Sequence, residues 1–399
     1  MGEQAIRFVA ALWHVVGFLI LLVLFIEFGV DWLRRGMRRL RRGTSPRPHR
    51  TARADAYGGA DWPIPYFDEF RRSVRLDWKE YVGWWQRPLR GRYVTIDERG
   101  WRATPGEREA GPDAVRILCF GGSTMMGMGA RDAATIPAVL ARRLAELGHP
   151  AAVANLGQLA HNSTQETVAL HQLLKEGHRA DIAIFYDGIN EMVCAEQSGA
   201  ADRVFNEAAR RAEFNLLLPD HRRDLVAAAL IAGLPRTVRR LRTLTGLGLR
   251  GPLPDGRVDL AAVDIAALAR RVIEVYAANL RLVRLLGGAY GFRPIFFWQP
   301  VITTKRVKTA DELFFEARFT GDLTLRRRLF GAIIEERRCH PELAEAAGVI
   351  DLSRLFDDRP DPVYIDLYHL SEPGNAAVAE AMLPALAAAV ATVREERNR

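Results

Sequence analysis

The chain has 399 residues, of which 49% are hydrophobic and 9% aromatic, and its formal net charge is +8. This composition is sufficient for a packed core, and the length allows either two domains or one large domain with a smaller attachment. Nine arginines fall between Arg34 and Arg53. The basic balance therefore belongs to one segment and gives little reason to expect binding to nucleic acid. Three scattered cysteines without CxxC spacing indicate neither a disulfide framework nor a zinc site.

The amino-terminal stretch from Phe8 to Ile26 has 19 residues, and His14 is its only strongly polar side chain. A helix of this length, at about 1.5 Å per residue, nearly spans a bilayer core of roughly 30 Å. We therefore expect a transmembrane anchor over residues 6–30. A cleaved signal peptide and a buried core helix are the alternatives. The weakly charged leader and the absence of a small-residue cleavage site fit a signal peptide poorly.

The charges that flank this stretch predict its orientation. One arginine, Arg7, precedes it and nine follow it, so the positive-inside rule places the rest of the chain in the cytoplasm. A periplasmic or extracellular domain is the alternative. Residues 31–60 form a basic linker in this prediction. Their arginines should contact anionic lipid headgroups, so the membrane is an expected partner.

Residues 61–110 are rich in aromatic side chains. Two interpretations are open: the rings bind sugars by stacking, or they pack as an extension on the main domain or at the membrane interface. We favour packing. The aromatic residues concerned are Trp62, Tyr66, Phe67, Trp78, Tyr81, Trp84, Trp85 and Trp101.

From residue 111 to residue 393, short apolar runs alternate with amphipathic stretches, a pattern typical of a parallel sheet covered by helices. The stretch of about 195–258 interrupts this order and is expected to be a helical insertion. Predicted strands are Val115–Phe120, Ala152–Leu156, Ile182–Tyr186, Pro294–Trp298 and Val349–Leu352. Predicted helices are Ala133–Leu147, Ser163–Glu176, Leu260–Leu286, Leu323–Ala347 and Pro373–Val393.

A glycine-rich stretch, CFGGSTMMGMG, follows the first predicted strand at residues 119–129. A Walker loop would require a lysine that this stretch lacks. A dinucleotide fingerprint would require an acidic residue at the end of the next strand, where the chain reads Asn155-Leu156-Gly157. These mismatches leave Ser123 as the functional candidate.

A serine hydroxyl needs a base, an acid that orients the base, and oxyanion donors before it acts as a nucleophile. Asp366 and His369 lie three residues apart in a predicted loop before the last helix. The carboxylate can hold one imidazole nitrogen while the other faces Ser123. Gly157 and Asn190 follow the second and third strands, and can offer a backbone N–H and a side-chain amide beside the N–H of Ser123.

These four blocks, with Ser123, Gly157, Asn190 and His369 in this order, resemble those of the SGNH (GDSL-type) hydrolase family. The resemblance covers Val115 to about Leu386. It implies a flavodoxin-like three-layer α/β/α sandwich. It also implies ester chemistry in which Ser123 attacks, His369 is the base, Asp366 orients it, and Gly157 and Asn190 bind the oxyanion.

Two departures from the commoner family pattern stand out. Gly122 occupies a position that is more often Asp, and Glu191 follows the asparagine where Asp is more common. Both features resemble a branch of membrane-attached bacterial members, some of them associated with modification of cell-surface polysaccharides. They affect the expected substrate more than the expected mechanism.

The sequence therefore predicts a membrane-anchored serine esterase acting on an acylated carbohydrate or lipid-linked substrate. An O-acyltransferase with the same acyl-enzyme and a non-catalytic membrane scaffold are the alternatives. Asp187 and Gln299 are candidate substrate contacts, and Lys305 is expected near the same rim. No metal or organic cofactor is expected.

Overall fold

The computed structural model describes residues 2–29, 50–107, 110–111, 113–216, 258–317 and 322–399. The chain divides into two compact units, one of residues 1–47 and 206–256 and one of residues 48–205 and 257–399. Most of the predicted basic linker (31–60) and most of the predicted insertion (195–258) lie outside the described residues.

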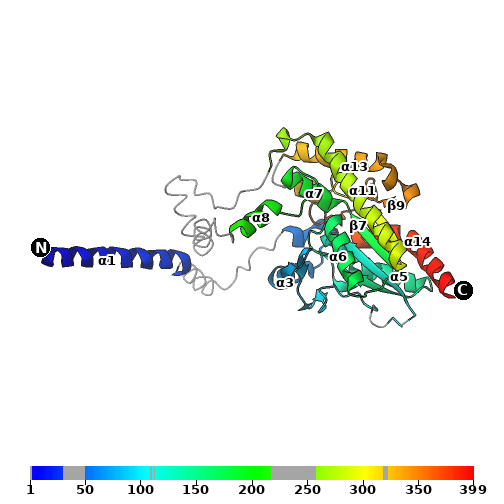
Figure 1. Cartoon of the computed structure of the whole chain (residues 1–399), viewed down its shortest axis with the longest axis horizontal. Helices are drawn as coiled ribbons and strands as arrows, with labels where there is room; N and C mark the ends of the chain where they lie inside the picture. The colour runs from blue at the N-terminus through cyan, green and yellow to red at the C-terminus, as the bar shows by residue number, and fades with distance from the viewer. Residues whose placement is uncertain (1, 30–49, 108–109, 112, 217–257, 318–321) are drawn as a thin grey trace. The chain divides into compact units, whose positions relative to one another are not determined.

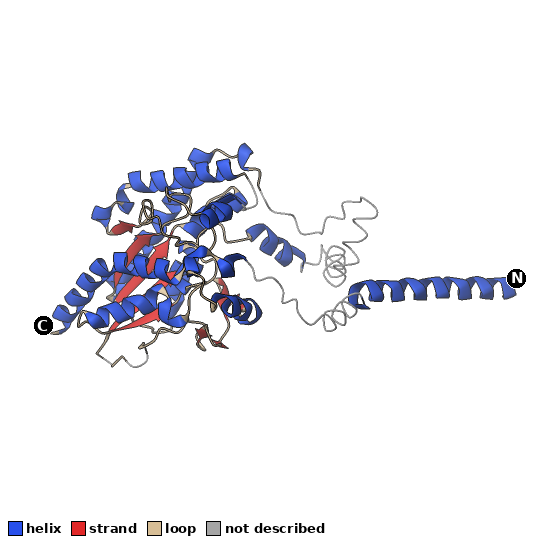
Figure 2. Ribbon diagram, turned by 180° about the vertical axis from the view of Figure 1, so that it is seen from behind, coloured by secondary structure: helices blue, strands red, loops and turns tan. Residues whose placement is uncertain are grey.

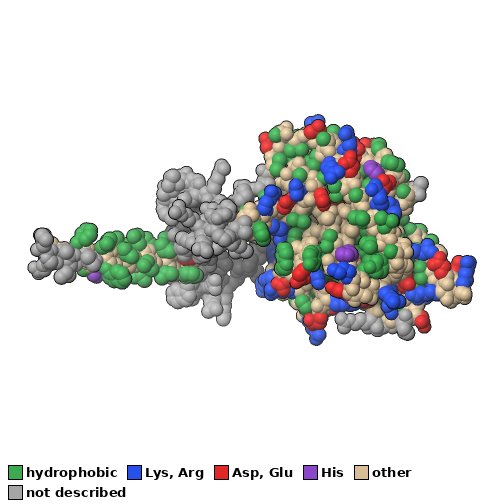
Figure 3. Space-filling model, in the orientation of Figure 1, with side chains coloured by type: hydrophobic (Ala, Val, Ile, Leu, Met, Phe, Trp, Pro, Cys, Tyr) green, Lys and Arg blue, Asp and Glu red, His purple; other side chains and the backbone are tan. Residues whose placement is uncertain are grey.

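The smaller unit contains helix α1 (Gly2–Leu24), which continues into the π-helical turn η1 (Phe25–Gly29), and helix α8 (Glu207–Leu216). The exposed apolar side chains of α1 include every position from Phe18 to Leu22, so they lie on all sides of the helix. Figure 3 shows those on one face. Residues 10–29 are long and apolar enough to cross a membrane. A helix that is apolar all round fits a lipid environment or a signal sequence.

The larger unit is built on a five-stranded sheet in the order β6-β5-β7-β8-β9, with all neighbours parallel (Figure 2). This order is that of flavodoxin-like folds, so the predicted α/β class is confirmed. Parallel pairing brings the carboxyl ends of β5, β6 and β7 to one edge. The strands are β5 (Val115–Gly121), β6 (Ala151–Asn155), β7 (Ile182–Asp187), β8 (Arg293–Trp298) and β9 (Val349–Asp351).

Helices cover both faces of the sheet (Figures 1 and 2). Alternate residues of β5 supply two hydrophobic cores, with Ile117 and Cys119 on one face and Leu118 and Phe120 on the other. Burial on both faces explains why these strands read as continuous apolar runs. One face carries α5 (Ile136–Glu146) and α14 (Glu372–Arg397), and the other carries α6 (Ser163–Lys175), α7 (Ile189–Ser198), α11 (Ile265–Tyr290) and α13 (Leu323–Cys339).

The predicted strands agree with the structure to within one residue at each end. The predicted helix Leu323–Ala347 is wrong after Cys339, where α13 ends. Pro341 begins a short 3-10 turn there, since proline cannot continue the hydrogen-bonding pattern of a helix. Helix α14 also passes a test of length and apolarity for membrane spans, but it packs against the sheet as a core helix.

The amino-terminal part of the larger unit packs on the sheet domain. Tyr66 is fully buried, and its hydroxyl accepts a hydrogen bond from the N–H of Gly129 at 2.8 Å. Trp84 and Trp101 are each 4% exposed, so these two rings are buried in the fold. The elements of this part are α3 (Pro63–Ser73), β1 (Leu76–Lys79), β2 (Gly83–Gln86), β3 (Leu89–Arg90) and β4 (Thr95–Ile96).

Candidate active site

Ser123 begins a single helical turn, α4 (Ser123–Met126), directly after β5. Its carbonyl accepts hydrogen bonds from the N–H groups of Gly127 and Met128 at 3.0 and 2.9 Å. Gly127 then reverses the chain with a φ of 86°, a left-handed conformation that favours glycine. This sharp turn fixes the Ser123 side chain at the carboxyl edge of the sheet.

The structure brings Ser123, His369 and Asp366 into one hydrogen-bonded chain. Ser123 Oγ lies 2.7 Å from His369 Nε2, and His369 Nδ1 lies 2.6 Å from Asp366 Oδ2. Ser123 is 7% and His369 5% exposed, so both are shielded from water, whereas the Asp366 side chain is half-buried at 28% exposed. This is the geometry in which a base can take the proton of a serine hydroxyl while a carboxylate orients the ring.

Asp366 also organises the loop that carries the histidine. Its Oδ1 accepts hydrogen bonds from the backbone N–H groups of Tyr368 and His369 at 3.0 and 2.8 Å. Burial would raise the pKa of Asp366, but the His369 charge and these hydrogen bonds together hold that pKa below its usual value. Asp366 is therefore an anion over the whole neutral range, as the orienting role requires.

A buried ion pair supports the same loop from below. Lys305 and Glu312 are 1% and 0% exposed, and Lys305 Nζ donates to both carboxylate oxygens of Glu312 at 2.8 and 2.6 Å. Glu312 Oε1 also accepts from the N–H groups of Val363 and Tyr364. The prediction that Lys305 lies at the rim of the site is thus wrong. The sequence around Lys305 does not indicate that its side chain pairs with Glu312, seven residues further on.

Arg102 holds the turn that follows Ser123 and was missed in the sequence. The side chain is fully buried and donates to the carbonyls of Met126, Gly127 and Ala130 at 3.2, 2.8 and 2.6 Å. It also forms an ion pair with Asp132 at 3.0 Å. A cation that binds several carbonyls of one turn fixes that turn more firmly than an apolar contact can.

Asn190, the predicted oxyanion donor, lies against Gly122, the residue before Ser123: a Cβ atom at position 122 would overlap its Nδ2. Its Nδ2 donates to the carbonyl of His161 at 2.5 Å. An amide nitrogen carries two hydrogens, so a second N–H is left for a ligand. Glu191 fixes this segment, because its two carboxylate oxygens accept from the N–H groups of Ser163 and Gly188 at 2.6 and 2.9 Å. A glutamate after Asn190 therefore joins the segments that follow β6 and β7.

Gly157 has a different contact from the one predicted. Its N–H donates to Asn155 Oδ1 at 3.0 Å, so the structure does not present this N–H to an oxyanion. Asn155 Nδ2 in turn donates to the carbonyl of Met125 at 3.1 Å. A Cβ atom at position 157 would overlap the backbone nitrogen of Met126, so glycine is needed for close approach to the turn of Ser123.

Asp187 and Gln299 lie in the interior, so the structure does not support their predicted contact with substrate. Asp187 is 4% exposed and accepts a hydrogen bond from the hydroxyl of Tyr276 at 3.4 Å. Gln299 is 1% exposed, and its Oε1 accepts from Thr124 Oγ1 at 3.1 Å. Gln299 thus supports the residue next to the serine from behind.

A substitution at Gly122 tests whether the side-chain amide of Asn190 is needed for activity. Its backbone has an ordinary φ of −78°, but a Cβ atom there would overlap Nδ2 of Asn190. We expect Gly122→Ala to displace this amide, which can move, and to lower kcat on p-nitrophenyl acetate by roughly 10²- to 10³-fold, the usual effect of losing one oxyanion donor. The melting temperature should change little. Gly331→Ala, with open space around it, is the control. Full activity of Gly122→Ala would show that the amide is not needed.

Two buried carboxyl groups lie behind the segment of Asn190. Burial, followed by the charges of Asp187 and Glu191, raises the pKa of Glu166 well above its usual value. Burial and Glu191 also raise the pKa of Asp187, although hydrogen bonds from Glu166 and Tyr276 oppose this. Both oxygens of Glu166 lack a geometric hydrogen-bond partner among the described residues. Burial therefore favours the protonated, uncharged form of both carboxyl groups.

The raised pKa of Glu166 makes the stability of the fold depend on pH. Because the folded pKa of Glu166 is raised, its favourable contribution is complete below the unfolded value, about 4.5, and is lost as pH rises through the folded pKa. The unfolding free energy should fall by about 1.4 kcal/mol per pH unit in that window. We expect Glu166→Gln to flatten this fall in denaturant titrations between pH 5 and 8. Glu176→Gln, at the exposed end of α6, should not. Parallel curves for wild type and Glu166→Gln would contradict a raised pKa of Glu166 in the folded chain.

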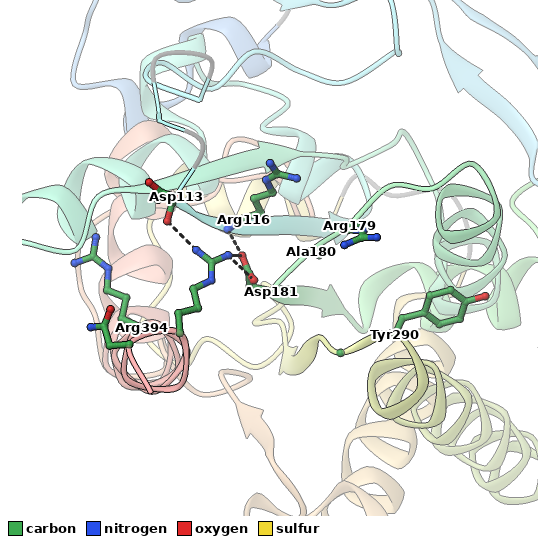
Figure 4. A pocket seen from close by; sticks show the side chains of 10 residues that line it. Asp113, Arg116, Arg179, Ala180, Asp181, Tyr290 and Arg394 are labelled. Carbon is green, nitrogen blue, oxygen red and sulfur yellow. Dashed lines mark hydrogen bonds and ion pairs between the residues drawn. The ribbon is translucent and has the colours of Figure 1, made fainter.

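A hollow of about 840 Å³ opens at the opposite end of the sheet (Figure 4). It lies where β5 and β7 begin, around Asp181 and Arg116. Asp181 there accepts two hydrogen bonds from Arg397, both at 2.7 Å, which join the end of α14 to the sheet. The hollow therefore belongs to the packing of that helix and not to the site around Ser123. Among the described residues, no group of His, Cys, Asp or Glu side chains is placed to hold a metal ion.

No protein-family model matches the sequence, and no curated protein matches it. Solved structures give low-similarity matches. A protein named for the lipolytic G-D-S-L family, from Desulfitobacterium hafniense, is 10% identical with a TM-score of 0.33, covering 67% of this chain and 97% of its own. The acetyl xylan esterase AlAXEase is 13% identical with a TM-score of 0.32, covering 68% and 99%.

A catalytic mutant of Axe2, an acetylxylan esterase from Geobacillus stearothermophilus, is 14% identical with a TM-score of 0.37, covering 69% of this chain and 94% of its own. Likeness at this level does not define the chemistry of this chain. The geometry of its own residues must carry any functional conclusion.

Proposed function

We propose that the protein is a serine esterase that cleaves acyl esters through Ser123, His369 and Asp366. The observation that carries this proposal is the continuous chain of contacts, 2.7 Å from Ser123 Oγ to His369 Nε2 and 2.6 Å from His369 Nδ1 to Asp366 Oδ2. A non-catalytic scaffold would have no need for a buried relay of this geometry.

In the proposed reaction, Ser123 Oγ attacks the ester carbonyl while His369 Nε2 takes the serine proton. Asp366 stabilises the resulting imidazolium, and the N–H of Ser123 with Nδ2 of Asn190 stabilises the oxyanion. The carbon–oxygen bond to the alcohol then breaks, and His369 returns its proton to the leaving alcohol. Water, deprotonated by His369, attacks the acyl-enzyme, and the acid is released as His369 returns this proton to Ser123 Oγ. A sugar hydroxyl in place of water would give acyl transfer.

The acyl group is proposed to be short. A small apolar cavity of about 10 Å³ lies between the segment of Asn190 and the loop of His369, lined in part by Ile189, Leu367 and Tyr368. Space of this size holds about one water-sized group. Ser123 and His369 do not line this cavity themselves. We propose that the acyl group extends from Ser123 toward it, since the space holds an acetyl methyl but not a long acyl chain.

A series of p-nitrophenyl esters tests the proposal on the full chain in detergent. Acetate should be hydrolysed faster than butyrate and octanoate, with acetate as the acid product. Saccharide acceptors and mass spectrometry then separate hydrolysis from transfer, because only transfer gives an acylated sugar. Absence of hydrolysis and of transfer for every ester would contradict the proposal.

Helix α1 is proposed to attach this enzyme to a membrane, with the larger unit on the cytoplasmic side. The support is its exposed apolar surface and the arginine-rich stretch after it, of which residues 30–49 lie outside the described residues. Protease treatment of spheroplasts tests the orientation, since digestion of the larger unit from outside would contradict it.

A further inference from the structure

Two aromatic rings of the β1–β2 hairpin are turned to solvent. Trp78 is 76% and Tyr81 81% exposed, whereas Tyr66, Trp84 and Trp101 of the same region are at most 4% exposed. Large aromatic side chains gain most of their stabilisation from burial, so two exposed rings on one hairpin contribute little to this fold. Exposure of this kind is typical of a surface that binds something.

The hairpin is attached to the site around Ser123. Trp84 Nε1 donates to the carbonyl of Leu159 at 2.7 Å, and His161 Nε2 lies 3.0 Å from the carbonyl of Trp84. The carbonyl of His161 receives the amide of Asn190, the proposed oxyanion donor, at 2.5 Å. One residue, His161, thus separates the hairpin from the catalytic machinery.

The strand register places Trp78 on the same face of the hairpin as Trp84, because the two lie directly opposite each other in the antiparallel pair. Directly opposite residues project from the same face of a two-stranded ribbon. Trp84 and Trp85, which project from opposite faces, both lie against His161, with ring centroids 5.5 and 5.7 Å apart. The hairpin is therefore fixed beside His161, and Tyr81 lies in the turn at its tip.

The chemistry of the tip favours a neutral polar ligand. The exposed charges beside the rings are of both signs: Asp77 and Glu80 are acidic, Arg75 and Arg87 are basic, and Asp77 is paired with Arg87 at 2.5 Å. This mixture favours neither an anionic nor a cationic ligand, and the carboxylates can accept hydrogen bonds from hydroxyl groups. A flat ring flanked by acceptors matches the apolar face and the hydroxyl edge of a sugar.

We propose that Trp78 and Tyr81 bind the saccharide part of an acylated carbohydrate whose ester is cleaved at Ser123. This inference rests on the proposed esterase function and names its substrate class. It predicts that activity rises with the number of sugar rings, because additional rings reach the hairpin.

The test compares two substrates on the full chain in detergent: p-nitrophenyl acetate, and acetylated xylo-oligosaccharides of one to six sugars. Trp78→Ala and Tyr81→Ala should each lower kcat/KM on the longer oligosaccharides by about two- to tenfold, the range of one aromatic contact. Hydrolysis of p-nitrophenyl acetate should stay unchanged. Trp78→Phe should restore most of the loss. Tyr290→Ala is the matched control, since Tyr290 is 54% exposed at the opposite end of the sheet.

Each contrary outcome has its own meaning. Equal kcat/KM of wild type and Trp78→Ala on every oligosaccharide, with p-nitrophenyl acetate still hydrolysed, would overturn the hairpin proposal alone. If the wild type hydrolyses neither substrate, this result would overturn the esterase function instead. A third measurement places the full chain in nanodiscs of brominated lipid, which quenches tryptophan fluorescence on contact. Quenching in the wild type that is lost in Trp78→Ala would place the Trp78 ring in the membrane interface and would also overturn the proposal.

Discussion

Ser123→Ala should abolish labelling by a fluorophosphonate probe and lower kcat on p-nitrophenyl acetate by roughly 10⁶-fold, the usual loss when a catalytic serine is removed. In the wild type, Oγ attacks phosphorus, fluoride leaves and the proton passes to His369, which lies 2.7 Å away. Alanine removes the attacking oxygen, so no covalent product can form.

The fold should tolerate this change. Ser123 lies at the first position of the short helix α4, and alanine is a good helix former. The melting temperature of Ser123→Ala should therefore stay within a few degrees of wild type. Ser198→Ala, at the end of α7, serves as the control and should keep full labelling. Equal labelling of Ser123→Ala and wild type would show that another residue is the nucleophile.

Asp366→Asn should lower kcat by about 10⁴-fold while leaving the loop in place. The asparagine oxygen can still accept from the backbone N–H groups of Tyr368 and His369. Its nitrogen, however, is a donor and would face Nδ1 of His369 where a carboxylate now accepts. The imidazole would then carry its proton on Nε2, where it cannot take a proton from Ser123.

The same variant should change stability at acid pH. Because the folded pKa of Asp366 is lowered, its contribution is present above the ordinary value of 3.8 and is lost as pH falls through the folded pKa. Asp366→Asn should lack that acid limb in unfolding curves measured between pH 2 and 6. Asp358→Asn, an exposed neighbour, should retain it. Activity of Asp366→Asn within tenfold of wild type would rule out the orienting role.

Much of the fold follows from local pattern. Strands buried on both faces produce apolar runs such as Val115–Gly121, and their length and order are visible in the sequence. Ser123, Asp366 and His369 could be chosen because they follow strands or precede a helix, and parallel strands bring such positions to one edge. The short spacing of Asp366 and His369 keeps their contact local.

The direction of individual groups depended on contacts between distant segments. The N–H of Gly157 donates to Asn155 because a side chain at the end of β6 reaches both that group and the turn of Ser123. Asp187 faces inward because α6 and α11 place Glu166 and Tyr276 against it. No pattern of neighbouring residues carries this information.

The aromatic residues of the amino-terminal region show the same difference between what the sequence predicts and what the tertiary structure decides. Their number showed that this region packs against something or binds something, since large rings are rarely left without contacts. Only the pairing of Trp78 with Trp84, and the contact of Trp84 with the segment of His161, separated exposed rings from buried ones. The sequence by itself determined which elements form and which residues can do chemistry, because both depend on local spacing and side-chain type. Tertiary structure alone decided which donors are free, which carboxyls are buried and which rings face solvent, because these properties arise from segments that meet only in the folded chain.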